Sequence, residues 1–361
     1  MVGSYPRPHW FHQQLLGRDI RSAFKEVAHE ETFVDAVAAV VRDQEEAGLD
    51  IVTDGNMWYD DYVGVIGSFC WYLYERIPGF EPSRNPHPSG VGQDPSQGKA
   101  ILDDWGGVIN NGPVDAAPDT LRWTDLYEIA ARFASAPIKV SIGAGPANLA
   151  WHVYFNEDSH YKSPKELTFA LAPIFNKEMK DLVALGAKYL QIEDLGAWLP
   201  LFTGDLNDYK WIRESIEMMC DGVDARIGWH FCFGNAWGND ILSSSFPEGY
   251  QTVLPHFFGT EGIDEFVLDY ANREMAGVEF LKNLPSDTGV QVGVLDIRNN
   301  MIDQPGMVAE RTRKVLEHVS PEQVTLSTDC GLKPLSRMVA RMKLENLAEG
   351  AAIVRKEIGA G

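Results

Sequence analysis

The sequence RIGWHFCFGN, residues 226–235, shows most directly how this chain is built. It starts as a short run of apolar, β-prone residues, places His230 and Cys232 two positions apart, and reaches Gly234, where a loop is expected. Side chains two apart on a strand point to the same face. The stretch therefore predicts a buried strand that presents an imidazole and a thiol together at its end.

Seven other short runs of apolar, mostly β-branched residues accompany this one, and most are separated by segments with helical periodicity. Eight strands in such alternation predict parallel pairing with right-handed crossovers, which is the α/β architecture of a (β/α)₈ TIM barrel. The eight runs cover residues 1–4, 49–53, 138–142, 188–192, 226–233, 265–268, 290–295 and 323–326.

Four amphipathic segments are the clearest predicted helices. The second begins after Ser163, a good N-cap, with Pro164 at the first helical position, and ends at Gly186. The four segments cover residues 23–47, 164–185, 305–318 and 334–358, the last being long enough for two helices.

Residues 58–119 interrupt this rhythm, because they separate the second and third strands by more than a crossover helix needs. A loop of such length is usually functional or disordered, and high aromatic content argues against disorder. We expect a lid over the barrel mouth, an oligomer contact, or an excursion that only covers the barrel side. The chain is then a single domain, residues 1–361, with one insertion. Its aromatic residues include Trp58, Tyr59, Tyr62, Phe69, Trp71, Tyr72, Tyr74, Phe80 and Trp105.

The bulk composition narrows the function. A formal net charge of -21 without a basic run argues against nucleic acid and anionic membranes as partners. The start of the chain has no signal-peptide pattern and no segment offers a long apolar span, so we expect a soluble, cytoplasmic protein. Four scattered cysteines are too few for a disulfide framework, and Cys70 and Cys220 are interpreted as core thiols.

Polar side chains follow the predicted strands at the end where barrel active sites lie. Loops are polar in most proteins, but the recurrence at all eight ends favours one shared site. These ends carry Gly3 and Ser4, Asp54 to Asn56, residues 143–148, Glu193 and Asp194, His230 and Cys232, residues 269–273, Asp296 and Arg298, and Asp329 and Cys330.

A metal centre is the sharpest prediction from these ends. Cys330 follows the last predicted strand and can meet His230 and Cys232 at the same rim. One imidazole and two thiolates suit Zn²⁺, which leaves one position open when it is catalytic. The alternative is that all three are buried core residues, since free cysteine is among the most buried residue types.

Seven short motifs occur in a specific order: GSYPRP (3–8), QEEAGLDIVTDG (44–55), GP (145–146), QIED (191–194), HFC (230–232), GVLDI (293–297) and DCGLK (329–333). In this order they resemble the catalytic C-terminal barrel of the cobalamin-independent methionine synthase family. The resemblance spans nearly the whole chain, with the aromatic insertion as the main exception.

The resemblance implies that His230, Cys232 and Cys330 are zinc ligands and that Asp269 stands where the family has a ligating glutamate. The zinc would hold a thiol as a thiolate, since metal coordination deprotonates thiols, and its sulfur would attack an alkyl carbon. The implied substrate-binding residues are Gly3, Ser4, Asn56, Trp151, Glu193 and Asp194, and the implied catalytic residues are Asp296 and Arg298.

Besides Asp269, three positions depart from the family pattern. Asn56 replaces a glutamate that grips the amino group of homocysteine, and Glu193 replaces an aspartate that shares this task. Arg298 replaces a proton-donating histidine. Because arginine keeps its proton, Arg298 is a poor general acid and suits an anionic group such as a sulfonate or carboxylate.

We therefore expect a zinc-dependent transferase that activates a small thiol for S-methylation or another S-alkylation, with methylcobalamin, methyl-folate or an epoxide as the donor. The short chain resembles the single-barrel branch related to epoxyalkane:coenzyme M transferases, so epoxide:thiol transfer of the coenzyme M type and carbon–sulfur cleavage remain alternatives. From another class, a non-catalytic zinc or corrinoid-binding barrel stays open. The identity of the thiol and the formation of a homo-oligomer also stay open.

Overall fold

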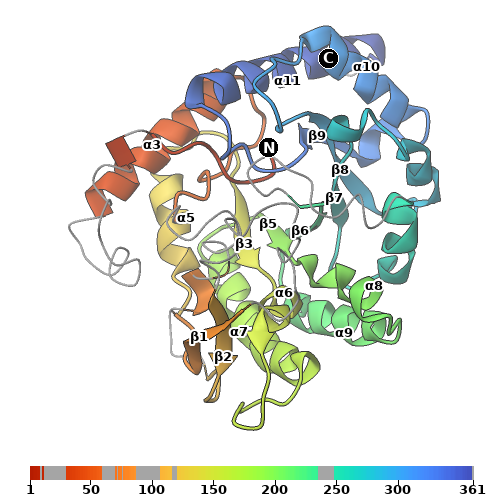
Figure 1. The fold of residues 1–361 in the computed structure, drawn as a ribbon. Helices are drawn as coiled ribbons and strands as arrows, with labels where there is room; N and C mark the ends of the chain where they lie inside the picture. The colour runs from red at the N-terminus through yellow and green to blue at the C-terminus, as the bar shows by residue number, and fades with distance from the viewer. Residues whose placement is uncertain are drawn as a thin grey trace.

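The computed structural model describes residues 1–8, 10–11, 30–58, 70, 72–74, 76–86, 106–115, 120–234 and 248–359. Within them, six strands form one parallel sheet in which each strand pairs with the next one of that sheet in the chain. Helices surround this sheet (Figure 1). This is the neighbour order that the predicted barrel requires. The strands are β3 Lys139–Ala144, β5 Tyr189–Glu193, β6 Arg226–Phe231, β7 Glu265–Asp269, β8 Gly289–Leu295 and β9 Val324–Thr328.

The first two predicted strands do not form regular strands, so the prediction was wrong in that respect. Val52 makes one isolated parallel bridge, with Ile138. Residues 1–4 are held instead by side chains on both sides: the Thr53 hydroxyl donates to the Gly3 carbonyl at 2.9 Å, and the Val2 N–H donates to the Thr328 hydroxyl of β9 at 3.1 Å. Side-chain hydroxyls thus replace part of the backbone ladder.

The helices agree well with the predicted segments. Helix α7, Pro164–Ala184, begins after Ser163, whose hydroxyl accepts the Glu166 N–H at 3.2 Å. The segment predicted as one or two helices is the single helix α11, Arg337–Glu357. Helix α3 covers Glu30–Glu46, and the predicted residues 23–29 before it lie outside the described part. The other α-helices are α5 Trp123–Ala131, α6 Pro146–Trp151, α8 Leu199–Thr203, α9 Asp208–Cys220 and α10 Pro305–Leu316.

Short 3₁₀ helices occupy several loops between these elements. They are η3 Leu195–Trp198, η4 Gly249–Thr252, η5 Leu254–Phe257, η6 Ala271–Arg273, η7 Val278–Asn283 and η8 Pro321–Gln323. No helix in the described part of the chain is both long enough and apolar enough to span a membrane.

The described part of the aromatic insertion belongs to a second, three-stranded sheet. Strand β1, Phe80–Pro86, pairs antiparallel with β2, Gly106–Asn110, and β2 pairs parallel with β4, Val153–Tyr154. The Tyr74 hydroxyl donates to the Leu149 carbonyl of α6 at 2.6 Å, which ties the insertion to the loop after β3. Its role as a lid or contact and the single-domain division stay predictions, because Tyr59, Tyr62, Phe69, Trp71 and Trp105 lie outside the described residues.

A cavity of about 570 Å³ lies at the amino-terminal ends of the strands. Its walls include the first half of β9, where Val324, Thr325 and Leu326 are only partly buried, and one side of α11. Lys139 and Gln291 reach it from the sheet. Elsewhere in the sheet, β3, β5 and β7 are buried along their whole length.

Candidate metal centre

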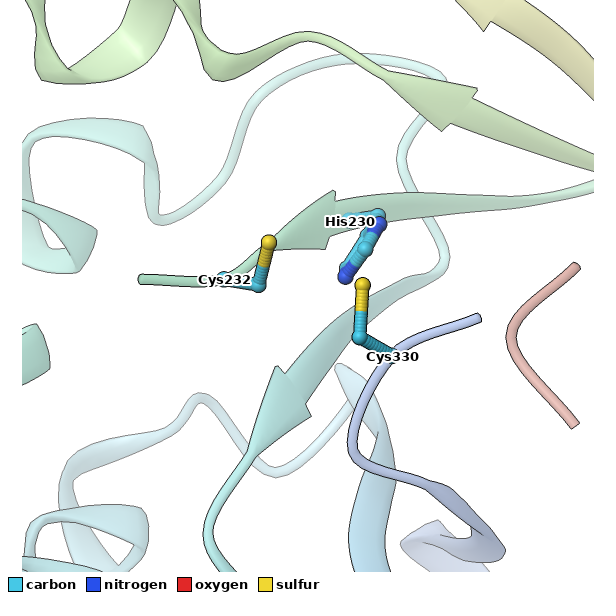
Figure 2. Close-up of side chains that lie close together, drawn as sticks. All are labelled: His230, Cys232 and Cys330. Carbon is cyan, nitrogen blue, oxygen red and sulfur yellow. The ribbon is translucent and has the colours of Figure 1, made fainter. Parts of the chain in front are cut away.

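His230, Cys232 and Cys330 meet at the carboxyl-terminal ends of the strands, with their ligand atoms within 4.8 Å of one another. His230 lies on β6 and Cys232 just beyond it, while Cys330 follows β9 (Figure 2). Because β7 and β8 separate β6 from β9, the sheet must curve to bring these side chains together. The predicted grouping of the three residues therefore depends on the curvature of the sheet.

The His230 ring is oriented by the neighbouring strand. Its Nδ1 pairs with the Glu193 carboxylate at the end of β5. Its Nε2 is buried and has no hydrogen-bond partner among the described residues. A buried ring nitrogen beside two cysteine sulfurs is the donor set that zinc prefers, so the residues present fit this ion.

The two thiols differ in acidity. A hydrogen bond with Cys232, together with the nearby His230 charge, lowers the pKa of Cys330 to about 7. The same hydrogen bond, together with burial, raises the pKa of Cys232 well above its ordinary value. The Cys232 sulfur also accepts the Gly234 N–H at 3.4 Å. The pair is thus arranged to supply thiolate character in a buried place, as metal ligation requires.

Asp269, the fourth predicted ligand, is not part of this group of three. It is fully buried, and its carboxylate pairs with the Tyr250 hydroxyl. Arg298 Nη2 lies 3.4 Å from Asp269 Oδ2 and 3.4 Å from the Gly234 carbonyl. Arg298 therefore reaches the rim beside the centre, as predicted from its place after β8, and its charge faces Asp269. Metal ligation by Asp269 stays a prediction.

Glu193, which pairs with His230, is linked through Ser141 to Asn56, and Gly3 lies against Asn56. The Ser141 hydroxyl donates to Glu193 Oε1 at 3.2 Å and lies 3.5 Å from Asn56 Nδ2. A β-carbon on Gly3 would lie 3.0 Å from the same amide nitrogen. Asn56 Oδ1 is buried and lacks a partner in the described part of the chain. Ser141 is absent from the sequence predictions, because it alternates with Ile138, Val140 and Ile142 and lies on the face that also bears Lys139, and no local signal places that face inside the barrel.

Ser4 packs directly against the loop that carries Cys330. Its carbonyl accepts the Leu332 N–H at 2.7 Å. A β-carbon on Gly331 would lie only 1.8 Å from the Ser4 hydroxyl oxygen, so residue 331 must be glycine for this approach. The GSYPRP and DCGLK motifs thus touch each other in the structure.

Asp194 and Trp151 have local packing roles in the structure. The Asp194 carboxylate accepts the N–H groups of Ala147 at 3.0 Å, Asn148 at 2.8 Å and Gly196 at 2.8 Å, and burial raises its pKa to about 6. It therefore fixes the start of α6. Trp151 is partly buried at the end of α6, with its ring 5.2 Å from that of Phe202. Substrate contact by either residue stays a prediction.

Two further aspartates shape the rim. Asp296 Oδ1 accepts the Arg298 N–H at 2.9 Å and so turns its own loop. Asp329, which the sequence analysis did not select as a site residue, accepts the Tyr270 and Ala271 N–H groups at 3.0 Å and 2.8 Å and the Asn272 N–H at 2.6 Å. The residue next to Cys330 therefore fixes the loop after Asp269.

Comparison with known proteins agrees with this architecture. The family described as "Cobalamin-independent synthase, Catalytic domain" matches residues 105–353. Methionine synthases from Sulfolobus acidocaldarius and Thermococcus kodakarensis are each 31% identical to the chain, over 99% of its length and 92% and 93% of theirs. The solved B12-independent methionine synthase from Shewanella sp. W3-18-1, in complex with selenomethionine, is 25% identical, with a TM-score of 0.80 over 100% of this chain and 98% of that one.

Proposed function

Since this chain belongs to the cobalamin-independent methionine synthase family, and is therefore a methyltransferase with an α/β barrel fold, we propose that it methylates a small thiol at a zinc ion held by His230, Cys232 and Cys330. The observation that carries the proposal is the unpartnered, buried Nε2 of His230 beside the two cysteine sulfurs. Asp269 is the proposed fourth ligand, and it would exchange its contact with Arg298 for the metal.

The protein groups prepare this centre for sulfur chemistry. Zinc, when bound, would turn a coordinated thiol into a thiolate at neutral pH. Glu193 holds the His230 ring so that Nε2 faces the sulfurs, and the burial of His230 and Cys232 keeps water away from them. A water-poor setting strengthens every charge interaction around the reacting sulfur.

The methyl donor that we propose is methyl-folate. The family is described as cobalamin-independent, which conflicts with the donor methylcobalamin that the sequence analysis also named, so methylcobalamin is not proposed.

Homocysteine is the first thiol candidate, because the relatives are named methionine synthases and one of them was solved with selenomethionine. Its ammonium group would meet the Glu193 carboxylate and the unpartnered Oδ1 of Asn56. The amide oxygen accepts a hydrogen bond but adds no charge, so this pocket would hold an ammonium with one acid.

The test is a titration of zinc-loaded protein with homocysteine, followed by X-ray absorption at the zinc edge and by methionine formation from methyl-folate. We expect about one zinc ion per chain and one added sulfur ligand on binding. An unchanged sulfur count with saturating homocysteine, and no methionine, would contradict the proposal and favour a non-catalytic zinc barrel.

A further inference from the structure

Lys139 places a charged group inside the barrel. It is 2% exposed, and its ammonium donates to the side-chain carbonyl of Gln191 and, at 2.9 Å, to that of Gln291. Burial lowers the pKa of Lys139 to about 8, although Glu265 and Glu193 favour its charge. Burying a cation costs free energy unless its hydrogen bonds compensate, so a buried lysine often has a specific role.

The contacts of Lys139 fix the orientation of the Gln191 side chain. An ammonium can only donate hydrogen bonds and a backbone carbonyl can only accept them. Gln191 meets one of each: Oε1 faces Lys139, and Nε2 donates to the Val2 carbonyl at 3.0 Å. The amide therefore has one allowed orientation, with its NH₂ group also donating to Glu193 Oε1.

The hydrogen bonds of Glu193 extend this fixed arrangement of donors and acceptors to His230. Glu193 Oε1 accepts hydrogen bonds from Gln191 and, at 3.2 Å, from Ser141, so this carboxylate acts as an acceptor. Its Oε2 faces Nδ1 of His230, which must then be the nitrogen that donates. A ligating histidine commonly gives its second N–H to a carboxylate, and that contact selects the ring nitrogen left for the metal.

We propose that Lys139 is a positioning residue for the metal centre: through Gln191 and Glu193 it fixes His230 with Nε2 directed at the metal. The proposal rests on the proposed function, because it takes His230 as a ligand. Without the cation, Oε1 of Gln191 loses the donor that holds it on the Lys139 side, so the side chain is less firmly placed, and Glu193 loses a nearby positive charge.

The experiment compares Lys139→Met with Tyr189→Phe. Methionine keeps the length of the side chain and removes the charge. Tyr189 belongs to the same buried polar layer, where its hydroxyl contacts Gln291 and Glu265, but it makes no contact with Gln191 or Glu193 among the bonds described. Zinc affinity is measured by competition with a chromophoric chelator, and folding by circular dichroism.

We expect Lys139→Met to weaken zinc binding about tenfold, the lower end of the scale for a lost outer contact of a metal-bound histidine, because Lys139 acts through Gln191 and Glu193. Tyr189→Phe should stay within about threefold of wild type. Lys139→Arg keeps a donor-only cation and should recover most of the affinity. If Lys139→Met fails to fold, Gln191→Met breaks the same series of contacts without removing the cation and should also weaken zinc binding.

Cys232→Ser separates this inference from the proposed function. Wild-type zinc affinity in a folded Lys139→Met or Gln191→Met protein, together with zinc loss in Cys232→Ser, would overturn the role of Lys139 and leave the metal centre intact. Retention of zinc by Cys232→Ser would overturn both.

Discussion

At His230, one ring nitrogen faces Glu193 and the other is directed at the two thiols. The motif alone indicates that His230 and Cys232 share a face, but not which nitrogen is available. That choice comes from Glu193, a residue of another strand, which the resemblance assigned to substrate binding. The contact depends on the register of β5 against β6, where Ile192 lies opposite Trp229, and no local pattern encodes this register.

The two cysteines give the first prediction. Cys232→Ser and Cys330→Ser each remove a soft ligand, so zinc content should fall from about one ion per chain to a small fraction, and activity should be lost. Metal analysis after dialysis and a methyl-transfer assay measure this. Cys220→Ser, at a buried thiol that is not part of the group, is the matched control and should keep its zinc. Full zinc and activity in both ligand variants would reject the assignment.

Asn56 gives a prediction about substrate choice. Asn56→Asp keeps the shape and adds a charge beside the expected ammonium, so kcat/KM for homocysteine should rise about fivefold, since charged hydrogen bonds are worth roughly 1 kcal/mol more than neutral ones. A thiol of the same length without the amino group, 4-mercaptobutanoate, should gain nothing. Equal changes for both thiols would show that Asn56 does not face the amino group.

Arg298 gives a prediction about the anionic group. Its side chain is 15% exposed, beside Asp269 at the rim, so it is placed to bind a carboxylate of the thiol or donor. Arg298→Met should lower kcat/KM about tenfold or more, the scale of a lost charged hydrogen bond of about 1.5–3 kcal/mol, while the protein keeps its zinc. Kinetics close to wild type would leave Arg298 with a structural role, through its contacts with Asp269 and the Gly234 carbonyl.

At the scale of the elements, two buried aspartates fasten the loops of the rim to neighbouring strands. Asp194 anchors the loop after β3, and Asp329 anchors the loop after β7. Each aspartate packs directly against a glycine of a neighbouring segment. A β-carbon on Gly145 would lie 2.3 Å from Asp194 Oδ2, and one on Gly293 would lie 2.4 Å from Asp329 Oδ1.

Gly293→Ala tests this arrangement. The added methyl group should push Asp329 aside, lower the free energy of unfolding by about 1–3 kcal/mol and weaken zinc binding, because Cys330 is the next residue. Urea denaturation and chelator competition measure the two effects. Gly306→Ala on α10 is the control, since nothing lies within 4 Å of its new methyl group. Unfolding curves that coincide for Gly293→Ala and wild type would contradict the account.

The strands and helices show which parts of the fold the sequence predicts. The six later strands and α7, α10 and α11 follow from apolar runs and capping residues, because these signals are local. Residues 1–4 and 49–53 look like strands by the same rule, yet the hydroxyls of Thr53 and Thr328 take hydrogen bonds that a ladder would use. Lys139 appears in the sequence only as a residue of a predicted strand and Gln191 only as the first residue of the QIED motif, and their link to His230 requires three strands in register.

At the scale of the whole molecule, the proposed zinc would bind only the folded protein and should stabilise it by mass action. A free zinc concentration of 100 times Kd adds about 2.7 kcal/mol, which for a chain of this size raises Tm by about 4 °C. Thermal unfolding with and without a chelator measures the shift. Cys232→Ser should give the same Tm in both conditions, and a wild-type Tm indifferent to chelator would argue against a zinc-linked fold.

The distance along the chain between the two halves of the centre also matters while the protein is being made. The strand that bears His230 and Cys232 leaves the ribosome well before the segment that bears Cys330, and β7 and β8 lie between them. A growing chain therefore lacks Cys330, one of the three residues that would hold the proposed zinc, until its last strand has emerged. We expect uptake of the proposed zinc to be a late event in biosynthesis, and a chain truncated before β9 to lack the complete site.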